Sequence, residues 1–108
     1  MDQKMNYADI LIRVMREEEE YQPLHGPKIV SVCDQEKGQF LLIAVGWQKD
    51  RHIDSILFHA QLADGMVIIE TDKTEEGLKS LLIEAGIRAE DFLSSKDYDQ
   101  SQSAQIAA

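Results

Sequence analysis

Residues 39–47 read Gln-Phe-Leu-Leu-Ile-Ala-Val-Gly-Trp, and this run is the strongest constraint on how the chain can fold. It is apolar at consecutive positions for most of its length, so as a strand it would present apolar side chains to both faces of a sheet. A strand of this kind belongs in the centre of a sheet with cover on each face. We therefore expect a sheet built around this segment.

Shorter segments on either side of the run also have the pattern of strands. Apolar residues alternate or cluster in 28–34, 52–62 and 66–70, and polar or glycine-containing turns separate these segments. Asp64-Gly65 is a typical two-residue hairpin turn. Because the connections are short, the four strands should form an antiparallel meander.

Two further segments have the 3.6-residue period of an amphipathic helix. The first covers residues 6–21, where Asn6 can cap the N-terminus. The second covers residues 75–85, with Thr74 or Asp72 as its cap. The predicted architecture is therefore an α+β fold of the order α-β-β-β-β-α, a four-stranded antiparallel meander sheet with the N- and C-terminal helices on one face.

The length of 108 residues predicts a single domain. We expect it to span residues 1–93, because residues 94–108 are rich in Ser, Gln and Ala and have little to bury. Two helices can cover only one face of four strands, yet the central strand is apolar on both. We therefore expect a homodimer or a protein partner to cover the other face.

Charge restricts the partners of the chain. Eleven Lys and Arg residues face twenty Asp and Glu residues, so the net charge is −9. Binding to duplex DNA requires a basic patch that releases counterions, and the basic residues here are scattered. The charge predicts no direct binding to nucleic acid and favours basic partners instead.

The sequence favours a cytoplasmic protein without a membrane segment. No apolar run approaches the ~18 residues that span a bilayer. The first residues, Met1 to Lys4, lack the basic and apolar regions of a signal peptide. A single cysteine, Cys33, is compatible with a reducing compartment.

The side chains that could carry chemistry have simpler explanations. Cys33 lies within an apolar strand and is expected in the core. His25, His52 and His59 are not at metal-ligand spacing. His59 could act in a small enzyme, but no nucleophile is placed beside it by a recognisable motif, and a half-buried strand histidine explains it as well. We assign no catalytic, cofactor-binding or metal-ligating residue, and no cofactor.

Trp47 and Arg51 are candidates for a protein interface. Trp47 ends the central strand, and Arg51 lies in the turn that follows. Tryptophan and arginine are the residue types that most often anchor interfaces. The alternative is that Trp47 closes one end of the core. We include His59 in the candidate interface because it lies on a strand face with apolar neighbours.

The order of several short motifs resembles the XisI family, cyanobacterial controlling factors for excision of the fdxN element in heterocysts. The residues that carry this resemblance are Val45-Gly46-Trp47, Asp50-Arg51, His59, Asp64-Gly65, Asp72, Thr74-Glu75-Glu76 and Ala85-Gly86-Ile87. The chain departs from the family pattern after these motifs, where Leu93-Ser94-Ser95-Lys96 replaces a Gly-Phe-His-like segment and a proline.

The resemblance implies a fold of antiparallel sheet plus helices and a function without catalysis. It implies work alongside an XisH-like protein, itself similar to nucleases, and a site-specific recombinase. An accessory factor for DNA element excision is the function we expect. The alternative is an antidote-like inhibitor that holds the nuclease-like XisH partner inactive, since an acidic surface can mimic nucleic acid toward a basic cleft.

Overall fold

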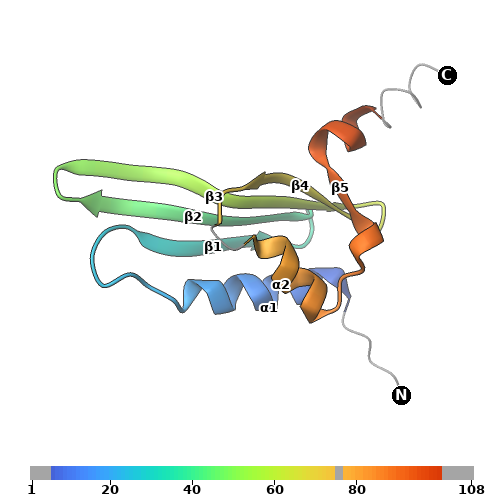
Figure 1. Ribbon diagram of the computed structural model, residues 1–108, viewed down its shortest axis with the longest axis horizontal. Helices are drawn as coiled ribbons and strands as arrows, with labels where there is room; N and C mark the ends of the chain where they lie inside the picture. The colour runs from blue at the N-terminus through green and yellow to red at the C-terminus, as the bar shows by residue number, and fades with distance from the viewer. Residues whose placement is uncertain (1–5, 75–76, 101–108) are drawn as a thin grey trace.

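A five-stranded sheet with two helices packed against it makes up the described part of the chain, residues 6–74 and 77–100 of a computed structural model (Figure 1). In chain order the elements are α1 (Tyr7–Glu19), β1 (Lys28–Asp34), β2 (Gln39–Gln48), β3 (Arg51–Ala63), β4 (Met66–Asp72), α2 (Leu78–Ala85), the 3-10 turn η1 (Ala89–Asp91) and β5 (Phe92–Ser94). The predicted α+β class is confirmed.

The sheet has one more strand than the sequence predicted. The strands lie in the order β1-β2-β3-β4-β5, and the first four form the expected antiparallel meander. β5 pairs with β4 in the parallel direction, so the sheet is mixed. The prediction of four antiparallel strands was incomplete because β5 has only three residues, too few for an alternation pattern, and it reaches β4 only after the chain crosses over through α2.

The two helices form where the apolar period predicted them, with shifted ends. α1 buries Ile10, Leu11, Val14 and Met15, and the Asn6 side-chain oxygen accepts a hydrogen bond from the Asp9 N–H at 2.8 Å. α2 begins at Leu78 rather than at residue 75, and the Leu78 N–H donates to Thr74 Oγ1 at 2.9 Å. Glu75 and Glu76 lie outside the described residues.

The core lies between the sheet and the helices. Phe40, Leu42 and Ala44 of β2 are buried, while Leu41, Ile43 and Val45 between them are half-buried. Alternation along a strand places these two sets on opposite faces. One face of β2 therefore belongs to the core shared with α1 and α2. The other face is the one for which the sequence predicted a homodimer or a protein partner as cover.

A bulge changes which side chains of β3 face the core. Phe58 lies opposite Leu42 of β2, but Ile56 lies opposite Ile43, so Leu57 is an extra residue. Strict alternation along the predicted strand 52–62 places Ile56 on the same face as Phe58, and this prediction was wrong because of the extra residue. Phe58 is fully buried, and Ile56 points to the opposite face, where 40% of its surface is exposed.

The predicted boundary between domain and tail falls inside a strand, because Ser94 ends β5. Residues 95–100 are helical, and Figure 1 shows them leaving β5 away from α1 and α2. Residues 101–108 lie outside the described residues, so a flexible tail there stays a prediction. Within 6–74 and 77–100, no helix is long and apolar enough to cross a membrane.

Candidate protein-interaction face

The sheet face that α1 and α2 leave uncovered carries a band of apolar side chains. The register of the strands places side chains from β1, β2 and β3 together on this face, because residues directly opposite in neighbouring strands point the same way. We call this surface the open sheet face, and its apolar members are Val30, Val32, Leu41, Ile43, Val45, Trp47 and Ile56.

Several of these side chains are unusually exposed for their type. Val32 exposes 44% of its surface and Trp47 exposes 62%. Scattered exposed apolar residues are common on proteins, but neighbouring ones on one face mark an interaction surface. The open sheet face thus has the composition of a protein contact.

Trp47 does not close the core. It lies opposite His52 near the end of the β2–β3 hairpin, and the two rings are tilted by 47° with centroids 4.9 Å apart. The hairpin extends past the ends of the helices, at the left of Figure 1. Its exposed position leaves the indole free to contact another protein, as an interface anchor requires.

Arg51 is exposed and lies opposite Gln48, one step nearer the hairpin tip than Trp47. In the turn between Gln48 and Arg51, Lys49 has a φ angle of +56°, which few non-glycine residues adopt. Neighbouring residues of a strand point to opposite faces, so Gln48 and Arg51 point away from the open sheet face that carries Trp47 and His52. The structure thus places Trp47 and Arg51 at the same hairpin tip but on opposite faces, and Arg51 is not a member of the open sheet face.

His59 lies elsewhere on the same face. It pairs with Leu41, six positions from Trp47 along β2, which is about 20 Å at the usual rise of a strand. The His59 Nε2 atom is 2.7 Å from Gln39 Oε1. The structure therefore does not join His59 to Trp47, and the apolar band lies between them.

The hydrogen bonds of His59 continue across the sheet. Gln39 Nε2 donates to Gln61 Oε1 at 3.4 Å, and Gln61 Nε2 donates to Glu70 Oε2 at 2.8 Å. This polar row links β2, β3 and β4 and borders the apolar band. The immediate partner of His59 is an amide, so the row fixes side-chain orientation and gives His59 no carboxylate or nucleophile to act with.

The remaining candidates from the sequence occupy ordinary positions. Cys33 packs against the core, and burial raises the pKa of its thiol, which disfavours the reactive thiolate. Among the described residues, no group of three or more His, Cys, Asp or Glu side chains could hold a metal ion.

A groove of about 430 Å³ lies beside β5 and α2. The Lys79 ammonium lies 5.3 Å from the centre of the Phe92 ring in this groove. Two of its other polar side chains cap the backbone, since Ser94 Oγ accepts a hydrogen bond from the Asp97 N–H at 3.1 Å and Asp72 accepts one from the Thr74 N–H at 3.1 Å. The groove contains the caps of neighbouring turns.

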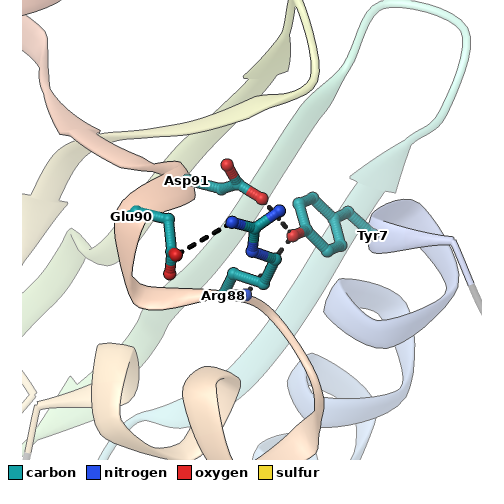
Figure 2. Close-up of polar contacts among 4 residues, drawn as sticks. All are labelled: Tyr7, Arg88, Glu90 and Asp91. Atoms are coloured by element: carbon teal, nitrogen blue, oxygen red, sulfur yellow. Dashed lines mark hydrogen bonds and ion pairs between the residues drawn. The ribbon is translucent and has the colours of Figure 1, made fainter.

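A second polar cluster joins the start of α1 to the segment before β5 (Figure 2). The Tyr7 hydroxyl donates to Asp91 Oδ2 and accepts a hydrogen bond from the Arg88 N–H at 3.3 Å. The Arg88 guanidinium lies 2.8 Å from the Glu90 carboxylate. The hydrogen bond to Asp91 raises the pKa of Tyr7, and Arg88 lowers the pKa of Glu90. The contacts of Tyr7 thus link the start of α1 to the segment before β5.

Most members of the open sheet face were not predicted from the sequence. Its signal was present in the run over 39–47, which is apolar at consecutive positions, but the members from β1 and β3 depend on strand register. Ile56 in particular faces outward only because of the bulge at Leu57.

Comparison with known proteins identifies the family. The profile of the XisI family, described as XisI protein, matches residues 1–105. The chain belongs to the XisI family. The predicted resemblance is confirmed, and the match extends through the segment where Leu93-Ser94-Ser95-Lys96 departs from the family pattern. No curated protein matches the chain.

Two solved structures from Anabaena variabilis share the fold. A XisI-like protein is 18% identical to this chain, with a TM-score of 0.72 over 81% of each chain. A second crystal structure, of the fdxN element excision controlling factor XisI, is 20% identical, with a TM-score of 0.64 over 81% of this chain and 80% of the other. At these identities the likeness shows that the XisI fold is shared.

Proposed function

We propose that this protein is a non-catalytic accessory factor for the excision of a DNA element. Membership of the XisI family supports the process, since a relative of the same fold is described as an excision controlling factor. The observation that carries the mechanism is the open sheet face, an apolar band with an exposed tryptophan at one end. In this proposal the protein acts through contacts with other proteins, in the cytoplasm.

The proposed partner is an XisH-like protein, and through it a site-specific recombinase. Trp47, at the hairpin end of the open sheet face, supplies the main anchor, and Arg51, on the opposite face of the same hairpin tip, supplies a second contact to a partner that encloses the tip. His59 and the polar row lie at the other side of the apolar band and would form a rim. The apolar side chains between them would be desolvated on binding.

Binding of an XisH-like protein from the same host to three variants tests the proposal. Arg51→Ala is expected to weaken binding by ~2 kcal/mol or more if Arg51 is an anchor, while thermal stability stays nearly unchanged because the side chain is exposed. Trp47→Ala is expected to behave in the same way, since the ring does not contribute to the core. Binding is measured by calorimetry and stability by thermal unfolding.

Lys37→Ala is the matched control, because Lys37 is an exposed cation in the other hairpin turn. Equal affinities of the Arg51→Ala and Lys37→Ala variants would remove Arg51 from the interface, and an unchanged affinity of Trp47→Ala would remove Trp47. Failure of the parent protein to bind any XisH-like protein would reject the partner itself.

The net charge of −9 favours one alternative, an inhibitor of a nuclease-like XisH partner. Glu17 of α1 and Glu20, the C-cap of this helix, are exposed acidic side chains. A negative surface of this kind can occupy a basic nucleic-acid cleft. A nuclease assay separates the two functions. Inhibition at one equivalent would favour the antidote-like function, whereas undiminished DNA cleavage by the complex would favour the accessory factor.

A further inference from the structure

β1 forms one edge of the sheet, and a glutamine side chain occupies part of that edge. Among the strands of the described residues, β1 pairs only with β2. The Gln22 side chain binds the backbone of Ile29 with both of its amide atoms, accepting from the Ile29 N–H at 3.0 Å and donating to the Ile29 C=O at 2.9 Å. The side-chain amide thus takes the place of one residue of a neighbouring strand.

The position of Gln22 shows which backbone groups of β1 point away from the sheet. The N–H and C=O of Ile29 point outward, so by the alternation of an antiparallel pair those of Ser31 and Cys33 do as well. Among residues 6–74 and 77–100, no hydrogen bond from another segment reaches the backbone of Ser31 or Cys33. An edge with unpaired backbone groups is a template for pairing with another strand.

The charges of β1 suit an antiparallel copy of the same strand. Lys28 lies at one end, and Asp34 lies at the other, with Glu36 just beyond it. Antiparallel pairing of two copies brings the basic end of each strand to the acidic end of the other, whereas parallel pairing would bring like charges together. The strand itself carries one cation and one anion, so it is locally neutral in an acidic chain, which limits the repulsion between two copies at this edge.

We propose that β1 pairs with β1 of a second copy, antiparallel and centred on Val32, so that the sheets of two copies become continuous. In this register Ser31 pairs with the outward-pointing backbone of Cys33 of the partner subunit, and each such pair exchanges both of its N–H···O bonds. Val32 meets its own copy on the two-fold axis. Ile29 keeps its bonds to Gln22, which therefore limits the length of the new ladder.

The arrangement also joins the exposed apolar surfaces of the two copies. Val30 and Val32 point to the open sheet face, and directly opposed residues share a face, so both open sheet faces lie on one side of the pair. The β2–β3 hairpins, which carry Trp47, lie away from the two-fold axis, so Trp47 stays accessible to another partner in the pair. The inference does not rest on the proposed function, because it concerns a different surface and a different partner.

A proline at residue 31 tests the pairing. The Ser31 N–H points outward and is not used by β2, so proline is tolerated at this edge position, whereas it removes a donor from the proposed ladder. Ser31→Ala is the matched control, since both variants lose the hydrogen bond from Ser31 Oγ to Glu19. We expect the parent and Ser31→Ala to sediment as dimers and Ser31→Pro to associate about tenfold more weakly or worse.

A monomeric parent across the accessible concentration range would overturn the proposal. Equal dimerisation of the Ser31→Pro and Ser31→Ala variants would also overturn it, provided that their thermal unfolding shows both to be folded.

A disulfide tests the register. In a Cys33→Ser background, Val32→Cys is expected to form an intermolecular disulfide on mild oxidation, because residues opposed in a non-hydrogen-bonded pair have Cα atoms about 4.5 Å apart. Val30→Cys in the same background is the control, since two residues at position 30 would be about 13 Å apart along the strands and cannot be bridged. Equal cross-linking of both variants, or of neither, would reject a two-fold axis at Val32.

Discussion

In the turn between β1 and β2, Gly38 has a φ angle of +67° and its carbonyl accepts a hydrogen bond from the Leu62 N–H at 2.9 Å. A Cβ atom at this position would lie 2.5 Å from the Leu62 carbonyl oxygen. Two separate penalties therefore act on any other residue, the left-handed backbone and the contact with β3. This glycine lets the first hairpin lie flat against the third strand.

Gly38→Ala is therefore expected to destabilise the protein by more than the ~1 kcal/mol typical of a left-handed glycine alone. Gly65→Ala is the control, because Gly65 also has a positive φ angle of +74° but nothing lies within 4 Å of the added Cβ. Urea unfolding of both variants measures the difference. Equal losses in free energy of unfolding would show that β3 moves aside at no cost.

The Tyr7–Asp91 hydrogen bond predicts how alkaline pH acts on the fold. It raises the pKa of Tyr7 above its usual value of 10.0, so the folded state holds this proton more tightly than the unfolded state. The stabilisation is complete below pH 10.0 and is lost as the pH rises from there through the folded pKa. In Asp91→Asn, a spectroscopic titration should show one tyrosine ionising at lower pH. An unchanged titration would contradict the role of this hydrogen bond.

At the scale of the elements, the edge strand β1 is held in part by a side chain outside the sheet. Gln22 lies in the connection between α1 and β1, and its amide makes two hydrogen bonds to Ile29. It also donates to the Glu19 C=O, so the same side chain links the end of α1 to the start of the sheet. One residue thus sets how the helix layer meets the edge of the sheet.

Gln22→Ala is expected to cost about 1 kcal/mol, because it exposes a backbone pair that the amide now satisfies. The Ile29 amide should exchange its hydrogen faster, which hydrogen exchange followed by NMR measures directly. Gln35→Ala serves as the control, since Gln35 is an exposed residue of the β1–β2 turn. Unchanged protection at Ile29 would mean that water replaces the glutamine without loss.

At the scale of the whole molecule, charge sets the behaviour toward nucleic acid. The chain carries −9 at neutral pH. In the part of the chain that the structure describes, no sheet face or helix gathers the basic residues. The purified protein is therefore expected not to bind duplex DNA at physiological salt. Fluorescence anisotropy of a labelled duplex measures this, and a salt-dependent rise at low micromolar protein would refute it.

The sequence alone determined the elements that arise from local interactions. β1 has the predicted bounds of 28–34, and the Asp64-Gly65 hairpin has positive φ angles at both residues, as its type requires. The period of apolar residues in α1 likewise predicted its buried face. In these cases neighbouring residues contain the whole physical reason, which is turn chemistry or the repeat of the backbone.

Tertiary structure decided what depends on contacts between distant residues. β5 exists because three residues after α2 find a parallel partner in β4, and Ile56 is exposed because of one extra residue in the pairing of β3 with β2. Trp47 is exposed because the β2–β3 hairpin extends past the helices, and Gln22 binds Ile29 because the connection after α1 runs beside β1. A strand pattern states that a residue alternates, but only the register and the covering layer decide which of its two faces meets water.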